Sequence, residues 1–322
     1  MGKQIKVALI GNPNTGKTSV FNALTGLNQK VGNYPGITVD KKEGICKLSR
    51  GVKAHILDLP GTYSLNASSI DENVVIELLL NQKDKDFPDV AVVVADVENL
   101  KRNLLLFTQI KDLKIPTILV VNMSDVMVRK GIALDIAELE TQLNTKIALV
   151  STRKGTGLQE LKTLIEGYKT LPKKQCLDAR SIDVDYFERL EKAFPNQEVY
   201  KLWLVVTQDV NFGKLARKEL DVSKFQTKST SELKRLQQKE AIKRYQFING
   251  VLKKSQVIDR SKAKDLRSKL DRILTHKVWG YVIFLAILMT IFQAIYDWAS
   301  FPMDLIDTSF ASLAEWVKNS FP

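Results

Sequence analysis

One stretch constrains this chain more than any other: a glycine-containing loop between an apolar run and a helix-forming run. Residues 11–18 read Gly-Asn-Pro-Asn-Thr-Gly-Lys-Thr and match the pattern G-x-x-x-x-G-K-[ST]. Residues 5–10, which precede the loop, predict a buried strand, and residues 19–25 predict the opening of a helix. A strand, a glycine loop and a helix N-terminus in this order form the context that a phosphate-binding loop requires.

The residues of this loop are expected to surround the phosphates of a nucleotide. Gly11 and Gly16 lack a Cβ, so the backbone can pass close to the anion, and successive N–H groups face it at the helix N-terminus. Lys17 is predicted to reach the β- and γ-phosphates, and the Thr18 hydroxyl to bind Mg²⁺. The loop residues predicted to contact the nucleotide are Gly11, Asn14, Thr15, Gly16, Lys17, Thr18 and Ser19.

Length, charge and cysteine content narrow the class of protein. A chain of 322 residues is long enough for about two domains. Its net charge of +12, from 48 basic and 36 acidic residues, points to an anionic partner such as a nucleotide, a nucleic acid or a lipid surface. Cys46 and Cys176 lie far apart without a C-x-x-C pattern, which argues against a zinc site or a disulfide framework and fits a reducing compartment.

Residues 1–170 alternate short apolar runs with amphipathic helical runs. This alternation predicts an α/β fold of the Ras-like type, a mostly parallel sheet with helices on both faces. The predicted strands are residues 3–10, 36–48, 53–58, 90–96, 115–122 and 146–150; the predicted helices are 17–25, 69–80, 100–113, 135–143 and 157–170. Ligands of such sheets bind at the carboxyl ends of the strands, where the motifs below fall.

Two further motifs follow predicted strands. Asp58-Leu59-Pro60-Gly61 matches D-x-x-G, so Asp58 is expected to hold Mg²⁺ through water and the Gly61 N–H to contact the γ-phosphate. Asn122-Met123-Ser124-Asp125 matches N-x-x-D, a guanine-recognition motif. The Asp125 carboxylate can accept hydrogen bonds from guanine, whereas adenine lacks that donor pair, which favours GTP or GDP over ATP.

The second position of N-x-x-D and a later loop complete the predicted guanine site. Many guanine sites have lysine where this chain has Met123, which offers an apolar contact to the base without a charge. Ser151, Thr152 and Arg153 follow the last predicted strand, where GTPases place a loop whose backbone contacts guanine O6. A polar turn of this kind is a weak signal by itself.

Two residues bear on hydrolysis, and a third is missing. Thr38 lies in a glycine- and proline-containing loop, residues 31–40, and is predicted to complete the Mg²⁺ shell. Thr62 stands where Ras-like enzymes carry a water-orienting glutamine, so slow or differently organised hydrolysis is expected. Asn14 is a candidate K⁺ ligand, and K⁺ could neutralise charge between the phosphates. The predicted catalytic set is Lys17, Asn14, Thr38 and Gly61.

The second half of the chain changes character. Residues 171–255 show helical periodicity and predict a small helical domain, with helices over 184–193, 198–206, 214–220 and 231–252. Residues 256–277 are strongly basic and predict a juxtamembrane helix. Residues 278–298 predict a transmembrane helix with aromatic residues at both ends, and 299–322 an amphipathic tail. The basic flank would place residues 1–277 in the cytoplasm.

Taken together, these motifs resemble FeoB, the bacterial GTPase-linked ferrous iron transporter. The more specific carriers are the loop at residues 31–39, the run at residues 58–65 and the segment at residues 270–277. The resemblance implies a G-domain, a helical spacer that tightens GDP binding, and switch movements that act on a membrane pore. It also implies the bacterial inner membrane and Fe(II) as cargo of a pore outside these residues. Small accessory transport proteins and a second copy of the chain, in a homo-oligomer, are further candidate partners.

One departure and two alternatives remain open. The family's pore has many membrane helices and this chain stops after the first, so a fragment or a truncated product is expected rather than half of a split transporter. The charge and the G-motifs also fit a GTP-dependent RNA or ribosome-assembly factor, although we find no RNA-binding motif and nucleic acid is the less favoured partner. Threonine at position 62, in place of the water-orienting glutamine, also fits a membrane-tethered switch that binds GTP without transport.

Overall fold

The computed structural model describes residues 4–27, 29–34, 40–66, 69–195, 197–207, 225, 228–259 and 273–320. It divides into two compact units, Met1–Asp259 and Arg260–Pro322. Thr38 and the helix predicted over residues 214–220 lie outside the described residues, as does most of the basic segment at 256–277.

A seven-stranded sheet lies at the centre of the first unit, in the order β2-β3-β4-β1-β5-β6-β8. Its strands are β1 (Gln4–Gly11), β2 (Gln29–Asn33), β3 (Asp40–Lys47), β4 (Lys53–Asp58), β5 (Val90–Asp96), β6 (Thr117–Asn122) and β8 (Lys146–Leu149). The pairs from β4 through β8 are parallel, and the edge pairs β2–β3 and β3–β4 are antiparallel. The predicted mostly parallel α/β sheet is therefore confirmed.

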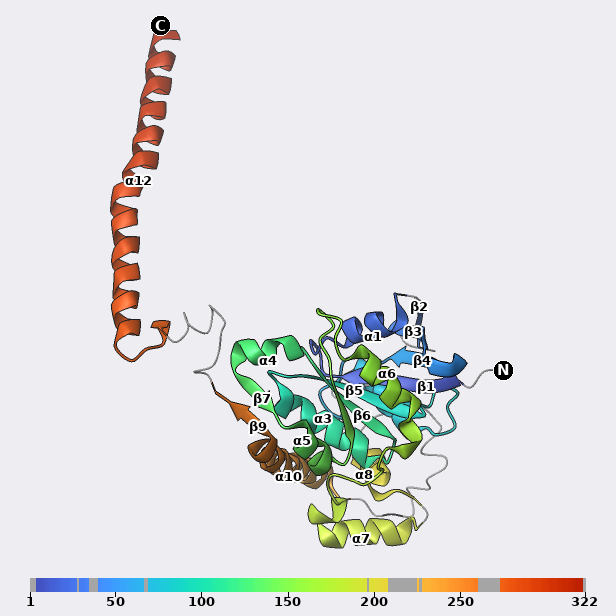
Figure 1. Cartoon of the computed structure of the whole chain (residues 1–322). Helices are drawn as coiled ribbons and strands as arrows, with labels where there is room; N and C mark the ends of the chain where they lie inside the picture. Colours follow the sequence, from blue (N-terminus) through green and yellow to red (C-terminus); the bar gives the residue numbers. More distant parts are fainter. Residues whose placement is uncertain are drawn as a thin grey trace. The chain divides into compact units, whose positions relative to one another are not determined.

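Helices cover both faces of this sheet (Figure 1). They are α1 (Lys17–Thr25), α2 (Ile70–Leu80), α3 (Leu100–Asp112), α4 (Ser124–Lys130), α5 (Ile136–Leu143) and α6 (Leu158–Glu166), with short 3-10 turns η1 (Ser49–Gly51), η2 (Tyr168–Thr170) and η3 (Ala179–Ser181). Alternate residues of a strand point to opposite faces. Accordingly, the odd-numbered residues of β5 pack with α2, α3 and α5, and its even-numbered apolar residues pack with α1 and α6.

A helical region follows, built from α7 (Val184–Ala193), α8 (Val199–Thr207) and α10 (Thr230–Ser255). A capping box of Ser229 and Glu232 begins α10, since each side chain bonds the other's backbone N–H. Apolar side chains of these helices join the same core that α2, α3 and α5 form on the sheet. The long helix α10 contacts α3 and α5 more than any other helix. The helical region is therefore attached to the sheet through these two helices.

Strand pairing revises two parts of the sequence prediction. Residues 29–33, which the glycine-rich pattern placed partly in a loop, form β2 at the sheet edge. Residues 256–258, predicted as the start of a basic helix, form β9 (Gln256–Ile258), antiparallel to β7 (Ile132–Leu134). Local sequence does not reveal such pairing because the partner strand lies more than a hundred residues earlier.

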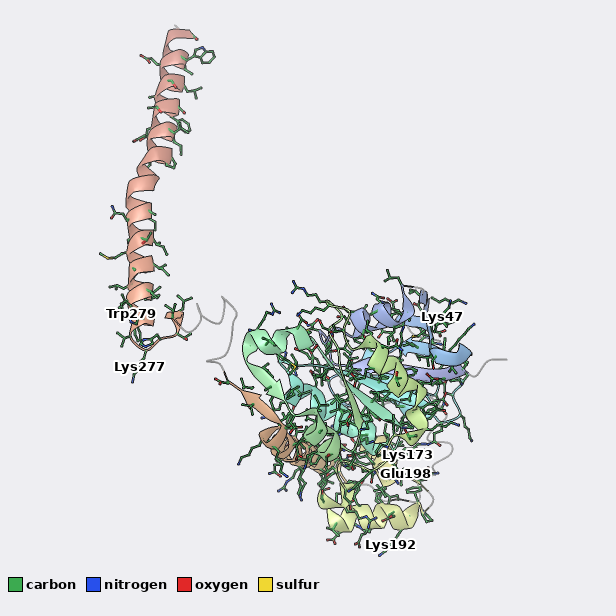
Figure 2. All side chains as sticks on the ribbon, viewed as in Figure 1. Lys47, Lys173, Lys192, Glu198, Lys277 and Trp279 are labelled. Atoms are coloured by element: carbon green, nitrogen blue, oxygen red, sulfur yellow. The ribbon has the colours of Figure 1, made fainter. Side chains whose placement is uncertain are left out.

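The second unit contains α12, a 42-residue helix over Trp279–Ser320 with Pro302 inside it. The helix runs without a break past residue 298, where the sequence predicted the boundary between a membrane span and a tail. Within the described residues, none of the helices combines the length and apolar character that a membrane crossing needs, so the span predicted over 278–298 is not confirmed. Figure 2 shows side chains projecting outward from α12, with Trp279 labelled at its first residue.

Candidate nucleotide site

Parallel pairing brings the predicted motifs to one edge of the sheet. Leu9 of β1 lies opposite Asp58 of β4, and Asp96 of β5 lies opposite Asn122 of β6. The loop at residues 12–16 begins where β1 ends, at Gly11. Since the carboxyl ends of parallel strands meet at one edge, the three predicted motifs surround one region of the surface.

The glycine loop lies tightly against its neighbours. Gly16 has a φ of +79°, a left-handed conformation that favours glycine, and a Cβ there would overlap the side-chain nitrogen of Asn122. A Cβ on Gly11 would come within 2.6 Å of the carbonyl oxygen of Val94. Asn14 is also left-handed, with a φ of 67°. The loop therefore forms a tight cradle that requires glycine at positions 11 and 16.

Asn122 holds this cradle from the side. Its Nδ2 donates a hydrogen bond of 3.0 Å to the carbonyl oxygen of Thr15. The amide is almost completely buried, and within the described residues its Oδ1 has no partner. Asn122 therefore fastens the third motif to the first by a bond between residues 107 positions apart.

Lys17 and Asp58 are in direct contact. The Lys17 ammonium forms an ion pair with Asp58 Oδ1, and the two side chains are 12% and 4% exposed. The neighbouring side chains of Thr18 and Ser19 are exposed. The Thr18 hydroxyl and the Asp58 carboxylate are oxygen donors of the kind that Mg²⁺ prefers.

The Asp125 carboxylate is oriented by a residue from the last motif. Ser151 Oγ donates a hydrogen bond of 2.8 Å to Asp125 Oδ1. This bond, with smaller contributions from Arg129 and Arg153, lowers the pKa of Asp125. Sequence reasoning assigned the backbone of the Ser151 loop to the base but missed the role of this hydroxyl toward Asp125.

Met123 adopts a left-handed conformation, with a φ of 60°, at the N-cap of α4. Its Cε would lie 3.6 Å from a Cβ placed on Gly16. Met123 thus lies beside the glycine loop, and its contact with a guanine base stays a prediction. Thr152 is partly buried and Arg153 is exposed beside it.

The segment that follows Gly61 is held by residues that sequence reasoning missed. The Thr62 hydroxyl lies 2.9 Å from the carbonyl oxygen of Ser64 and 3.0 Å from Glu72 Oε1, and the same carboxylate oxygen accepts the Tyr63 N–H at 3.2 Å. Thr62 is fully buried. Its hydroxyl is therefore engaged within this segment and with Glu72; slow or differently organised hydrolysis stays a prediction.

A polar cavity of about 150 Å³ lies beside the glycine loop. Its walls come from the loop, from Tyr63 after the second motif, and from residues around the start of α3. The lining residues are Asn12, Pro13, Asn14, Thr15, Tyr63, Asp96, Asn99, Arg102 and Asn103. In the part of the chain that the structure describes, no group of three or more His, Cys, Asp or Glu side chains is arranged to hold a metal ion.

The sheet order, the glycine cradle and the Asn122–Thr15 bond define a P-loop G-domain, followed by a helical region. The family model described as "Ferrous iron transport protein B" matches residues 5–165. The chain therefore belongs to the ferrous iron transport protein B family, and it corresponds to the G-domain part of such transporters. The resemblance drawn from the motifs is confirmed.

Individual relatives agree with this assignment. The "Fe(2+) transporter FeoB" of Leptospira biflexa is 34% identical over 98% of this chain and 47% of the relative. An "Fe(2+) transport protein A/Fe(2+) transporter FeoB fusion protein" of Porphyromonas gingivalis is 33% identical over 100% of this chain and 40% of the relative. The chain thus spans about half the length of the curated relatives it matches.

Solved structures are similar as well. The cytosolic domain of T. maritima FeoB in GDP form I has a TM-score of 0.70 and 31% identity, covering 80% of this chain and 100% of that one. The GMPPNP form of the same domain has a TM-score of 0.68 and 29% identity, covering 79% and 99%. The likeness therefore includes the helical region as well as the sheet.

Proposed function

We propose that this chain binds GTP and hydrolyses it to GDP and phosphate as the nucleotide-switch module of a bacterial Fe(II) uptake transporter. The observation that carries this proposal is the joining of the motifs by hydrogen bonds: Asn122 to Thr15, and Ser151 to Asp125. The first bond links the predicted guanine motif to the phosphate loop, and the second holds the carboxylate that we propose accepts hydrogen bonds from the base. Relatives named as FeoB transporters, solved with GDP and GMPPNP, support the assignment.

Phosphate binding is assigned to the loop. Backbone N–H groups between Gly11 and Ser19, including those of Thr15 and Gly16, would face the phosphates, and Lys17 would leave Asp58 to neutralise them. When bound, Mg²⁺ would supply charge neutralisation at the phosphates. Thr18 and Asp58 are the described residues suited to hold it, and Thr38 is proposed from the sequence alone.

Hydrolysis without the usual glutamine is proposed to be slow and stimulated by K⁺. The Gly61 N–H would respond to the γ-phosphate, and its backbone lies against the loop, since a Cβ there would be 3.1 Å from Pro13 Cγ. Asn14 offers an amide oxygen, a suitable ligand for K⁺, from an exposed position. Asn122, Met123, Asp125, Ser151, Thr152 and Arg153 complete the proposed nucleotide contacts.

A change in base specificity is the direct test. Asp125→Asn should weaken GTP binding and strengthen XTP binding, because the amide presents a donor where guanine also donates. Asp185→Asn, on an exposed position of α7, serves as the matched control and should leave both affinities unchanged. Equal loss of GTP and XTP binding in the Asp125 variant would contradict the guanine assignment.

A cation comparison tests the proposed K⁺ site. Initial rates of GTP hydrolysis should be higher in KCl than in NaCl at equal ionic strength. Asn14→Gly removes the amide and tolerates the left-handed backbone, so it should abolish the difference without unfolding the loop. A difference that persists in this variant would assign K⁺ stimulation to other groups.

We also propose that the second unit associates with the lipid of the bacterial inner membrane. Many described apolar side chains of α12 are exposed, among them Phe284 at 63%, Met289 at 71% and Phe310 at 68%. Exposed apolar surface of this extent is typical of a membrane or protein contact. Carbonate-resistant membrane association of residues 1–322, lost in residues 1–259, is the expected result.

Transport partners are proposed from the family. Fe(II) would pass through membrane regions outside these residues, while residues 1–277 face the cytoplasm. The fusion of transport protein A to FeoB in one relative supports a small accessory protein as partner. A homo-oligomer is a further proposal, which sedimentation of the membrane-extracted protein would test.

A further inference from the structure

Two side chains of α3 hold the segment that follows Gly61. The guanidinium carbon of Arg102 lies 4.2 Å from the centre of the Tyr63 ring, a cation–π contact. Gln109 Oε1 accepts a hydrogen bond of 2.8 Å from the Leu65 N–H. Arg102 and Gln109 are seven residues apart, about two helical turns, so they share one face of α3.

The two contacts differ in character. Gln109 is 2% exposed and belongs to the core between α3 and the sheet. Arg102 is exposed, and Tyr63 is 43% exposed. The Arg102–Tyr63 pair can therefore be changed without opening the core, which makes it the part of this attachment open to experiment.

The pair also lies beside the proposed phosphate site. Arg102 and Tyr63 line the same cavity as Pro13 and Asn14 of the glycine loop. Tyr63 is two residues from Gly61, whose backbone lies against Pro13. A ring fixed by Arg102 therefore limits where the Gly61 and Thr62 backbone can lie relative to the loop.

We propose that Arg102 is a positioning residue for GTP hydrolysis: it holds Tyr63, and through it the Gly61–Thr62 backbone, against the phosphate loop. The inference rests on the proposed GTPase function. The cation–π contact of Arg102 is with Tyr63, in the segment after Gly61. Loss of Arg102 should therefore lower kcat while the KM for GTP and the affinity for GDP stay unchanged.

The experiment compares steady-state hydrolysis and GDP affinity in a set of matched variants. Removing an exposed cation–π contact should reduce kcat by about two- to five-fold in Arg102→Ala and in Tyr63→Ala. Arg102→Lys and Tyr63→Phe keep a cation and a ring and should retain most of kcat. Lys101→Ala removes an exposed neighbouring cation on the same helix and should behave like the wild type.

The double variant separates positioning from a general loss of charge. If the two residues act through each other, Arg102→Ala combined with Tyr63→Ala should have the same kcat as either single variant. Three results would overturn the inference: an unchanged kcat in Arg102→Ala, a loss of kcat in Lys101→Ala equal to that in Arg102→Ala, or additive losses in the double variant. A wild-type chain that does not hydrolyse GTP would instead overturn the proposed function.

Discussion

Lys17 and Asp58 form an ion pair that joins the first two motifs across 41 residues of sequence. Both side chains are nearly buried, so neither charge is well solvated. Each is also a group proposed to bind part of a magnesium nucleotide. The same ammonium and carboxylate groups that stabilise the nucleotide-free fold as an ion pair would therefore bind the ligand.

The first prediction concerns that stability. Lys17→Met leaves the Asp58 carboxylate buried without its partner, which should lower the free energy of unfolding in nucleotide-free buffer by about 1–3 kcal/mol. Adding Asp58→Asn removes the unpaired charge and should restore much of the loss. Urea denaturation of both variants measures this, and no recovery in the double variant would show that the pair is not the cause.

The motifs and the alternation of elements were predictable because both are local. Residues 5–25 combine a strand, a glycine loop and a helix start within one short stretch, and β5 is apolar except for its last residue, Asp96, as fits a strand buried on two faces. Asp58 and Asn122 were placed at strand ends by the same local patterns. Parallel pairing then brings them together without further information from the sequence.

The residues that escaped prediction act across long distances in sequence. Arg102 meets Tyr63, Ser151 meets Asp125, and Arg244 meets Asp112 over 132 residues. None of these pairs leaves a periodic pattern, since each depends on how elements remote in sequence come together. β9 was predicted as helix for the same reason: its partner β7 is remote, and β9 begins a longer segment, residues 256–277, whose basic composition is compatible with a helix.

The second prediction is a pH dependence of nucleotide binding. The Ser151 hydrogen bond lowers the pKa of Asp125, so the contribution of the carboxylate is present above the ordinary pKa and is lost only as pH falls through the lowered value. Ser151→Ala should raise that pKa. GDP should then dissociate at a higher pH on acidification than it does from the wild type, as measured by fluorescence titration.

Ser151→Ala should also weaken GDP binding at neutral pH. Loss of one hydrogen bond to the Asp125 carboxylate should lower the affinity for GDP by about tenfold, equivalent to about 1.4 kcal/mol. Ser49→Ala, at an exposed position of η1, is the matched control. Identical acid profiles for wild type and Ser151→Ala would contradict the orientation of Asp125 by Ser151.

The third prediction compares two glycines to separate the cost of a steric clash from the cost of a left-handed backbone. Gly26 and Gly157 both have positive φ, +64° and +79°. A Cβ on Gly26 would meet nothing within 4 Å, whereas one on Gly157 would overlap the carbonyl oxygen of Leu149. Gly26→Ala should cost about 1–2 kcal/mol of unfolding free energy from the left-handed backbone alone, and Gly157→Ala clearly more. Equal costs would contradict the close approach.

The fourth prediction concerns the buried polar cluster between α3 and α10. Arg244 bonds Asp112 Oδ2 at 2.7 Å and Glu240 Oε1 at 2.8 Å, while Tyr200 and Trp203 donate to Glu240. Arg244→Met would leave two carboxylates without their cation and should lower the unfolding free energy by about 3–5 kcal/mol. Arg235→Met, exposed on the same helix, should change it little in chemical denaturation.

The last prediction uses a thiol beside that cluster. Burial, followed by the nearby Asp112 charge, raises the pKa of Cys176 to about 12. Cys176 should therefore be alkylated slowly at pH 8.5 in the folded chain. The contribution of the buried thiol to the free energy of unfolding should be complete below the ordinary thiol pKa and should decline as pH rises toward 12. Mass spectrometry after iodoacetamide treatment of a Cys46→Ser variant reports on Cys176 alone. Reaction as fast as that of the urea-unfolded chain would show that the thiol is not held in this environment.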